Sequence, residues 1–541
     1  MLNIKAMRPE VLTLLLSVLF LSCFNYSLWQ HVAQITESDW PGLLLRVSFA
    51  LLLLAAFTLL LTLMAFRWVF KPLLTVLLFS GAGAAYFMSQ YGVMIDKGML
   101  RNILETNPAE TADLLSLKLG LYLLLLGALP TWLLWETPVN YRIWHAELLR
   151  KLLVIAGCSA LLVGVALSNY QGLSSLFRNH KELRLLVTPS NLVNAADGYL
   201  REQYASAKKP FSTLGEDAHK GPQWQQRQRK SLTVLVVGES ARAQNFSLLG
   251  YARNTNPELQ KEAGLISYPN VHSCGTETAV SVPCMFSNMT RDNYRASVAQ
   301  NQEGLLDVLQ RAGLQVIWRD NQSGCKGTCD RVIKDNVSDD RDPSLCANGE
   351  CHDEILLKNL QTFIDNLQQD TVLVMHPMGS HGPAYYKRYP KEFEKFTPAC
   401  ASNALNQCTE EQIVNGYDNT IYYADHVLAT LIDLLRKNQD TLDSAMLYLS
   451  DHGESLGEYN LFLHGTPYLL APDEQKHVAM FSWFSDGFQQ DFGLNTDCLR
   501  SQRTQPLSHD NLYHSMLGLL QISTQTYQPE LDMFAGCRQA Q

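Results

Sequence analysis

The sequence has no excess of positive charge, no internal repeat and no low-complexity tract. Lysine and arginine number 43 against 52 aspartate and glutamate residues, so the formal net charge is −9. This balance argues against a nucleic acid as a partner, because such binding relies on a basic surface. At 541 residues the chain also exceeds the length of one ordinary domain. We therefore expect more than one domain and no nucleic-acid partner.

Charged residues are scarce up to about residue 170, where Leu, Val, Ala and Phe dominate. The apolar runs in this part are long enough to cross a bilayer. No small-x-small cleavage site follows the first run and four more runs come after it, which excludes a cleaved signal peptide. The sequence therefore predicts five membrane spans, at about residues 10–32, 43–66, 70–91, 117–136 and 151–169.

Basic residues lie on one side of these spans, and this side is expected to be cytoplasmic. They precede the first span, separate the second from the third and separate the fourth from the fifth: Lys5, Arg8, Arg67, Lys71, Arg142, Arg150 and Lys151. The 33–42 loop instead carries Glu37 and Asp39 and no basic residue. An odd number of spans then places everything after residue 170 outside the cytoplasm.

Two segments next to the spans have mixed character. The 92–116 segment is amphipathic and fits either a helix on the outer leaflet or an ordinary surface helix. Its apolar residues are Met99, Leu100, Ile103 and Leu104. Residues 171–230 are polar with interspersed aromatic and aliphatic side chains, which predicts short interfacial helices rather than a disordered tether.

From residue 231 onward the sequence predicts a soluble α/β domain. Short apolar runs alternate there with helix-length amphipathic segments such as Gly304–Ala312 and Tyr417–Lys437. Near-continuous apolar strands between helices are typical of a mostly parallel sheet that is covered on both faces. The expected strands are Leu232–Val237, Leu314–Trp318, Val372–Met375, Ala445–Leu449 and Val478–Trp483.

Polar residues follow the ends of several of these strands. Glu239 comes after the first strand, His381 after the third, and Asp451 and His452 after the fourth, with His464 soon after. Function gathers at the carboxyl ends of strands in such sheets. An isolated histidine or glutamate at a strand end is more often structural. Several converging ends with carboxylates and imidazoles favour a zinc site.

The stretch 273–287 combines a turn, hydroxyl residues and two cysteines. Gly275 permits a sharp bend, and Thr276 has the character of a helix N-cap, which places Thr278 in the first turn. A helix N-terminus favours an anionic group such as phosphate, so a hydroxyl there could act as a nucleophile on phosphorus. Taken alone, the stretch is better explained as a capped helix with a structural disulfide.

Four strings resemble the lipid A phosphoethanolamine transferases, a family that includes the mobile colistin-resistance enzymes and belongs to the alkaline phosphatase superfamily. The resemblance covers the whole chain, the five spans included. It implies a transmembrane domain at 1–170, bridging helices and linker at 171–230, and a periplasmic catalytic domain of alkaline phosphatase or sulfatase type at 231–541. The strings are VVGESAR (236–242), SCGTETAVSVPCMFS (273–287), SHGPAY (380–385) and SDHGESLGE (450–458).

The resemblance also implies a catalytic zinc site. Its zinc ligands are Glu239, Thr278, Asp451 and His452, and Thr278 is the nucleophile. Coordination of a threonine hydroxyl lowers its pKa, which makes it reactive near neutral pH. One zinc ion is expected to bind tightly, with a second ion as an open alternative.

Four residues match substrate-contacting positions of the family. His381 and His464 match a second histidine cluster that holds a further zinc or the substrate phosphate, and either could act as acid or base. Lys326 matches a basic residue that contacts substrate. Gln322 stands where an asparagine is common in the family, so its part in donor recognition is an open point.

The activity implied by the resemblance is transfer of phosphoethanolamine from phosphatidylethanolamine to a lipid A phosphate through a covalent threonine intermediate. Such transfer lowers the negative surface charge and gives resistance to polymyxins, including colistin, and to cationic peptides. We expect a monomer in the inner membrane of a Gram-negative bacterium, in contact with membrane lipids.

Other activities remain as alternatives. A related phosphoethanolamine or phosphoglycerol transferase would differ in its glycan or lipid acceptor. A sulfatase would need Cys or Ser followed by x-Pro-x-Arg, and neither Cys274 nor Cys284 is followed in that way. A structural zinc protein would be expected to use a closed set of Cys and His ligands.

Cysteine usage supports export of the second part of the chain. Cys23 and Cys158 lie in predicted spans and are expected to be unpaired. The ten others lie outside the spans, and an even number in an exported domain implies disulfides. A Cys-x3-Cys metal site at 325–329 is disfavoured because no second pair of ligands is near it. Pairing of neighbours gives 274–284, 325–329, 346–351, 400–408 and 498–537, that is, Cys274, Cys284, Cys325, Cys329, Cys346, Cys351, Cys400, Cys408, Cys498 and Cys537.

Overall fold

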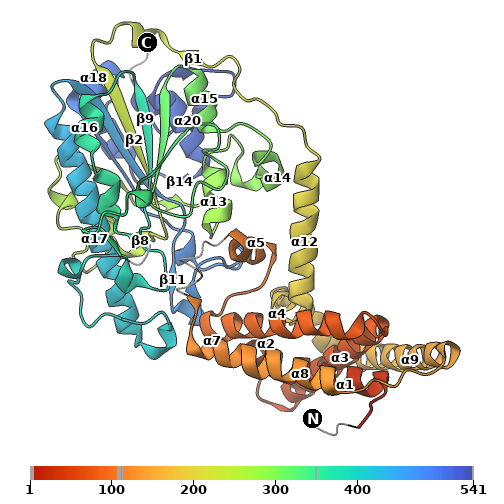
Figure 1. The fold of residues 1–541 in the computed structure, drawn as a ribbon. Helices are drawn as coiled ribbons and strands as arrows, with labels where there is room; N and C mark the ends of the chain where they lie inside the picture. The colour runs from red at the N-terminus through yellow and green to blue at the C-terminus, as the bar shows by residue number, and fades with distance from the viewer. Residues whose placement is uncertain (1–4, 106–110, 112–113, 348–349, 539–541) are drawn as a thin grey trace. The chain divides into compact units, whose positions relative to one another are not determined.

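The computed structural model describes residues 5–105, 111, 114–347 and 350–538 (Figure 1). The chain divides into two compact units. The first, called here the helical unit, comprises Met1–Leu100 and Leu115–Gly198. The second, called the α/β unit, comprises Arg101–Leu114 and Tyr199–Gln541. The predicted fold class, a helical membrane part joined to an α/β part, is confirmed.

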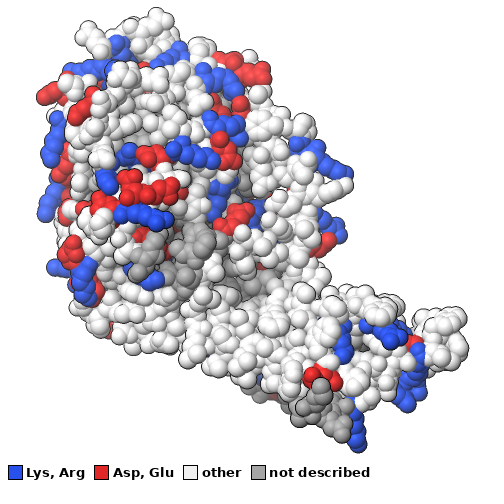
Figure 2. All heavy atoms as spheres, viewed as in Figure 1, with Lys and Arg blue, Asp and Glu red and all other residues white. Residues whose placement is uncertain are grey.

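Among the described residues of the helical unit, four stretches of helix are long and apolar enough to cross a membrane. Much of the visible face of this unit carries no charged side chains, and its lysine and arginine side chains gather toward one end, whereas charges of both signs are scattered over the α/β unit (Figure 2). The four stretches are α3 (Trp40–Met64), α4 (Phe70–Tyr91), the run α7 (Leu117–Tyr122), η2 (Leu123–Ala128) and α8 (Leu129–Glu136), and α9 (Trp144–Ser168).

Helix α9 begins at Trp144, earlier than the predicted start of the fifth span at about residue 151. The predicted span starts where the apolar run starts, and this run leaves out the basic residues of the first two turns of α9. These basic residues are nevertheless helical. The ammonium group of Lys151 lies 3.7 Å from the ring centroid of Phe66, so its charge has an aromatic partner within the helical unit. The charge of Lys151 is therefore compatible with a helical conformation at this position.

The first predicted span is a broken helix. It consists of α1 (Pro9–Leu19), η1 (Phe20–Phe24) and α2 (Tyr26–Ile35), and the two parts meet at an angle of 64°. The bend lies at Asn25, whose amide donates to the carbonyls of Phe20 (2.8 Å) and Thr188 (2.7 Å). Its oxygen accepts the N–H of Thr188 at 2.9 Å. These bonds replace helix bonds that the bend removes, as an apolar environment requires.

The two mixed segments contain helices. The amphipathic segment forms α5 (Lys97–Glu105), and the prediction for residues 106–110 and 112–113 lies outside the described residues. The chain after the last span forms α10 (Tyr170–Asn179), α11 (Leu183–Leu186) and α12 (Ser190–Ala207). The segment after residue 170 is therefore helical, as its pattern predicts, but α12, with 18 residues, is longer than the short helices expected.

A seven-stranded sheet forms the centre of the α/β unit, in the order β3-β13-β10-β2-β9-β5-β6. The strands from β10 to β6 are parallel to their neighbours, whereas β13 is antiparallel to both β10 and β3. The sheet is thus mostly parallel, as predicted. Its strands are β2 (Lys230–Gly238), β3 (Ile266–Tyr268), β5 (Gln315–Asp320), β6 (Ile333–Asn336), β9 (Thr371–His376), β10 (Leu442–Ser450) and β13 (Met480–Phe484).

Helices cover both faces of this sheet. Helices α16 (Leu360–Asp365) and α17 (Glu410–Lys437) lie on one side, and α15 (Leu305–Arg311) and α20 (Asp510–Leu519) lie on the other (Figure 1). The central strands are buried along their whole length, except for the first residue of β2. This burial explains why they read as unbroken apolar runs in the sequence.

Candidate active site

The register of the two central strands places the first group of polar residues side by side. Gly238 at the end of β2 pairs with Ser450 at the end of β10. The N–H of Asp451 then donates to the carbonyl of Gly238 at 2.8 Å. Glu239 and the Asp451–His452 pair therefore leave the sheet at the same edge, where one ligand atom of each lies within 4.8 Å of the others. All three residues are fully buried.

Thr278 joins this group from helix α13 (Thr278–Met285), of which it is the first residue. Its Oγ1 donates to Oε2 of Glu239 at 3.1 Å and lies 3.2 Å from Nε2 of His452. The expectation that Thr276 caps this helix is wrong. Glu277 occupies the N-cap position, and the hydroxyl of Thr276 donates instead to the carbonyl of Thr466 at 2.7 Å. The prediction that Thr278 lies in the first turn is correct.

The backbone fixes the tautomer of His452. Its Nδ1 lies 2.8 Å from the carbonyl oxygen of Gly453, which can only accept, so Nδ1 carries the proton. Nε2 therefore presents its lone pair to the site, 3.4 Å from Oε1 of Glu239 and 3.4 Å from Oδ2 of Asp451. Gly453 is essential to this turn, because a Cβ there would overlap the carbonyl oxygen of Glu474. An unprotonated, oriented Nε2 is what a metal ion requires.

The electrostatics of the group also fit a cation. Oδ2 of Asp451 is buried and has no hydrogen-bond partner among the described residues. Burial and the neighbouring Glu239 raise the pKa of Asp451 to about 6. Burial opposes ionisation of Glu239 too, but positive charge on the surrounding imidazoles, when these rings are protonated, lowers its pKa to about 2. Two carboxylates, one imidazole and one hydroxyl form an oxygen-rich set with an unsatisfied ligand atom, which suits Zn²⁺.

A pair of histidines lies beside this group. The ring centroids of His381 and His464 are 5.6 Å apart, and those of His452 and His464 are 4.4 Å apart. Nδ1 of His464 bonds to Oε2 of Glu454 at 2.8 Å. Burial disfavours the charged imidazole, yet the Glu454 carboxylate raises the pKa of His464 to about 9. Nδ1 of His381 is buried without a hydrogen-bond partner among the described residues.

The other two expected substrate residues differ in their surroundings. The amide of Gln322 donates to Oε2 of Glu239 at 2.8 Å, so it contacts the carboxylate group directly. Lys326 donates to the hydroxyl of Ser323 at 3.1 Å. Lys326 and Ser323 line a cavity of about 510 Å³ that Ala279 and Pro283 of α13 also line. Lys326 therefore faces a space next to the helix of the nucleophile.

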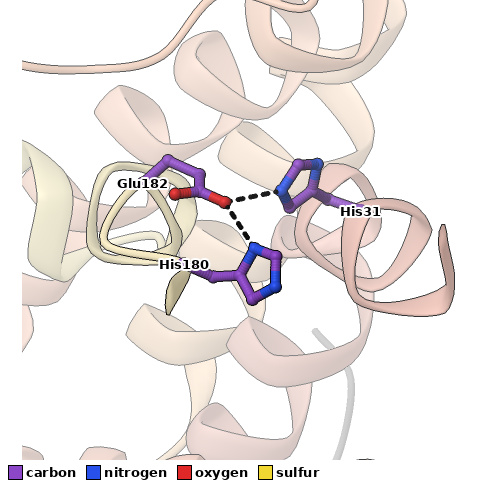
Figure 3. A group of neighbouring side chains, drawn as sticks. All are labelled: His31, His180 and Glu182. Atoms are coloured by element: carbon purple, nitrogen blue, oxygen red, sulfur yellow. Dashed lines mark hydrogen bonds and ion pairs between the residues drawn. The ribbon is translucent and has the colours of Figure 1, made fainter. Parts of the chain in front are cut away.

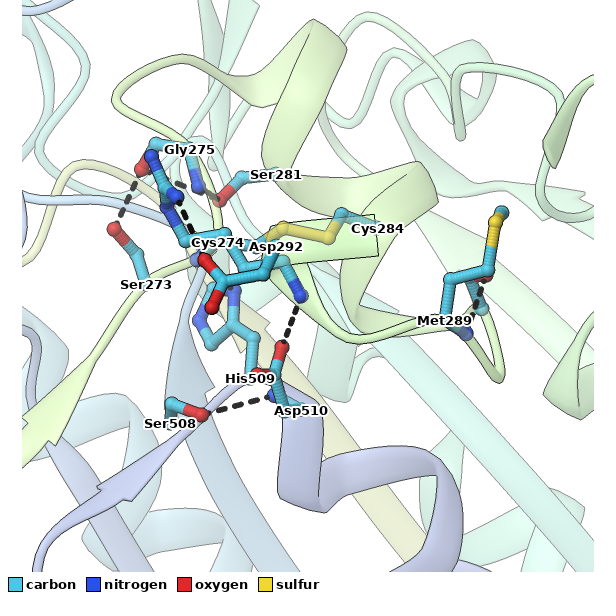
Figure 4. Close-up of a disulfide and its surroundings, with 12 residues drawn as sticks. Ser273, Cys274, Gly275, Ser281, Cys284, Met289, Asp292, Ser508, His509 and Asp510 are labelled. Carbon is cyan, nitrogen blue, oxygen red and sulfur yellow. Dashed lines mark hydrogen bonds and ion pairs between the residues drawn. A yellow bond between two sulfur atoms is a disulfide. The ribbon is translucent and has the colours of Figure 1, made fainter. Parts of the chain in front are cut away.

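The described cysteines outside the predicted spans form the five neighbouring pairs, and Cys23 and Cys158 are unpaired. The Cys274–Cys284 bridge connects the turn before α13 with the last turn of that helix (Figure 4). Ser281, between them, donates its hydroxyl to the carbonyl of Asp451. The helix of Thr278 is thus attached both to its own preceding turn and to the end of β10.

His509 is a further contact between these parts, which the sequence did not reveal. Its Nδ1 accepts the N–H of Cys274 at 3.1 Å, and both residues are labelled in Figure 4. Its Nε2 donates to the carbonyl of Ser450 at 2.9 Å. Burial lowers the pKa of His509 to about 4, so the ring is neutral near pH 7. The sequence analysis does not predict Glu454 either, although its place two residues after His452 indicates a role at the same strand end.

Two family models match this chain. The model described as phosphoethanolamine transferase EptA/EptB matches residues 53–204. The model described as sulfatase matches residues 231–522, which contain the Glu239, Thr278, Asp451 and His452 group and the His381–His464 pair.

Individual relatives match almost the whole chain. Phosphoethanolamine transferase EptA of Escherichia coli K12 is 44% identical over 532 residues, which cover 97% of this chain and 96% of that protein. Phosphatidylethanolamine transferase Mcr-1 of Escherichia coli is 36% identical, with 96% of each chain covered. The solved structure of the integral membrane lipooligosaccharide phosphoethanolamine transferase A from Neisseria meningitidis has a TM-score of 0.95 and 36% identity, and covers 99% of this chain and 100% of that one.

Proposed function

The chain belongs to the EptA/EptB family of phosphoethanolamine transferases, and on this basis we propose that it transfers phosphoethanolamine to a phosphate group of lipid A. The family predicted from the four sequence strings is thereby confirmed. The observation that carries the proposal is the position of Thr278, whose hydroxyl lies at a helix start within 3.2 Å of both Glu239 and His452.

In the first half of the reaction, Oγ1 of Thr278 attacks the phosphorus of phosphatidylethanolamine. A new bond forms between Oγ1 and phosphorus, and the bond from phosphorus to the glycerol oxygen breaks. Diacylglycerol leaves with a proton on that oxygen, and phosphoethanolamine remains on the threonine. The Glu239 carboxylate, which accepts the hydrogen bond of the Thr278 hydroxyl, is placed to draw the proton away as the attack begins.

In the second half, an oxygen of the lipid A phosphate attacks the same phosphorus. The bond from Oγ1 to phosphorus breaks, which regenerates Thr278, and the product carries a new diphosphate linkage. His381 and His464 are placed to protonate the leaving oxygen or to accept the proton of the acceptor. Glu454 holds the ring of His464 in one orientation, which fixes the direction of its free nitrogen.

Glu239, Thr278, Asp451 and His452 would hold the zinc ion, and this ligand set is the one that the family resemblance implies. Bound zinc would lower the pKa of the threonine hydroxyl and would stabilise negative charge on the phosphoryl oxygens. The buried, unpartnered Oδ2 of Asp451 and the oriented Nε2 of His452 support this ligand set. We further propose that Lys326 binds the phosphate or lipid part of a substrate in the adjacent cavity.

The membrane-spanning helices suit an enzyme whose donor and acceptor are both lipids. We propose that the protein is a monomer in the inner membrane of a Gram-negative bacterium, with residues 231–541 forming a periplasmic catalytic domain. Residues 1–170 would form the transmembrane domain and 171–230 the bridge. Modified lipid A would carry less negative charge, and the cell would bind polymyxins and other cationic peptides less strongly.

The test is an assay of the full-length protein in vesicles. Phosphatidylethanolamine with a fluorescent acyl chain is supplied with and without lipid A, and both labelled diacylglycerol and the mass of lipid A are followed. We expect sustained release of diacylglycerol only with lipid A, together with a mass gain of lipid A equal to one phosphoethanolamine. Release without a mass gain would assign the enzyme to another acceptor, and no release would overturn the proposal.

A further inference from the structure

A second cluster of metal-binding side chains lies in the helical unit. It consists of His31 on α2, and His180 and Glu182 in the connection between α10 and α11. One ligand atom from each lies within 4.8 Å of the others. Figure 3 shows both imidazoles directed at the same carboxylate oxygen. None of these residues belongs to the strings that identify the family.

The separations of the two imidazoles from the carboxylate are close to those of a zinc site, and the imidazole nitrogens lie within 4.8 Å of each other. Nε2 of His31 lies 3.3 Å from Oε1 of Glu182, and Nδ1 of His180 lies 2.9 Å from the same oxygen. With metal–ligand bonds of about 2.0–2.1 Å, ligands at the corners of a tetrahedron lie about 3.3–3.5 Å apart. Small adjustments of the side chains would therefore bring all three to bonding distance of one ion.

The cluster is accessible and is held in place by other contacts. The side chains of His31 and His180 are 29% and 31% exposed, whereas Glu182 is only 14% exposed. The cluster is thus open at its surface, and an ion that reaches it meets a partly buried carboxylate. The two segments are joined independently by Asn25 and Thr188, through two hydrogen bonds of 2.7 and 2.9 Å. Because these bonds already hold the two segments together, ion binding costs less conformational entropy.

We propose that His31, His180 and Glu182 bind one zinc ion, with a fourth position open to water or another oxygen ligand. Two neutral imidazoles and one carboxylate are a set that zinc binds readily, and imidazole favours zinc over calcium or magnesium. The ion joins the part of the first span beyond its bend to the chain that follows the last span. Its effect is to stabilise this face of the helical unit, independently of the transfer reaction.

The test counts zinc in the purified full-length protein after dialysis against a zinc buffer. His31→Asn and Glu182→Gln should each contain one zinc fewer per chain than the wild type. Asp451→Asn should lose a different zinc, so the His31→Asn/Asp451→Asn double variant should lose two. His145→Asn, which changes an exposed histidine of the same unit, is the matched control and should retain the wild-type zinc content.

A second readout separates metal binding from a simple hydrogen-bonded contact. In the Asp451→Asn background, added zinc should raise the melting temperature, and His31→Asn should abolish that rise. The proposal is overturned if His31→Asn and Glu182→Gln both keep the wild-type zinc content. It is also overturned if they lower the melting temperature equally with and without zinc, which is the result expected of a carboxylate that only accepts hydrogen bonds.

Discussion

The amide of Gln322 donates to Oε2 of Glu239 at 2.8 Å, and the same oxygen accepts the hydroxyl of Thr278 at 3.1 Å. Gln322 therefore orients the carboxylate that contacts the nucleophile. Groups that hold metal ligands in this way affect metal affinity without touching the metal. This contact gives Gln322 a positioning role that is separate from any contact with the donor lipid.

Gln322→Leu should weaken zinc binding by about 10- to 100-fold, because the Glu239 carboxylate loses the donor that fixes its direction. Competition with a chelator measures the affinity. Gln368→Leu, at an exposed position whose amide bonds only to the carbonyl of Asn366 among the described groups, serves as the control. A raised KM for phosphatidylethanolamine with unchanged zinc affinity would assign Gln322 to substrate binding instead.

Thr278→Ala should lower transfer by more than about a thousandfold while the fold and most zinc binding remain, because only the attacking oxygen is removed. Mass spectrometry of wild-type protein incubated with donor alone should find phosphoethanolamine on Thr278. Thr278→Ser tests whether the hydroxyl suffices and should keep part of the activity. An adduct on Ser281 or Thr276 would contradict the assignment.

The zinc ligands and the histidine pair should respond differently to substitution. Glu239→Ala, Asp451→Ala and His452→Ala should each lose the catalytic zinc together with the activity. His381→Ala and His464→Ala should retain that zinc and lose activity, since these rings lie beside the ligand group. Zinc content and transfer rate measured on the same preparations distinguish the two sets. An unchanged zinc count in Asp451→Ala would refute the ligand set.

Stability should depend on pH through His509. Its folded pKa of about 4 lies below the ordinary value of 6.5, because burial favours the neutral ring. The stability from neutral His509 is therefore fully present above pH 6.5 and is lost as the pH falls towards 4, by about 1.4 kcal/mol per pH unit. His509→Gln cannot ionise there, so its melting temperature should differ from wild type less at pH 5 than at pH 7.5. An equal difference at both values would show that the ring is not held neutral.

The Cys274–Cys284 bridge should matter more for activity than for stability. Removing a bridge over so short a loop costs about 2–3 kcal/mol in the chain-entropy account. A displacement of Thr278 by about 1 Å can cost about a hundredfold in rate. Cys274→Ser/Cys284→Ser should therefore lose more activity than its melting temperature suggests, and Cys400→Ser/Cys408→Ser should lose stability but keep activity. If both double variants lose activity in proportion to their loss of melting temperature, the Cys274–Cys284 bridge has no special role in catalysis.

The long buried elements could be predicted from the sequence, whereas the short and exposed ones could not. Strands β2, β9 and β10 lie within a few residues of their predicted bounds, because they are buried on both faces and form apolar runs. Strand β6 is not predicted, because its four residues are mainly exposed and carry no apolar pattern. Strand β13 is predicted, but its antiparallel direction is not. Strand direction depends on which strands pair, and a pattern of apolar residues carries no information about pairing.

The same distinction holds for the site. Glu239, Asp451 and His452 could be anticipated because each follows a buried strand directly. His509 could not, since it lies just before α20, far in sequence from the residues that it contacts. The bend at Asn25 was also hidden, because the hydrogen bonds that stabilise it come from Thr188, a residue beyond the last span.

Gly453 has a consequence for the variation that this enzyme can tolerate. Its carbonyl sets the proton on Nδ1 of His452, while the lack of a side chain lets the backbone pass the Glu474 carbonyl. Even alanine would force the turn apart and move the ligand before it and Glu454 after it. An inhibitor that contacts both the metal ligands and His464 would therefore be hard to evade by a substitution at Gly453, because even the smallest side chain there would disrupt the turn.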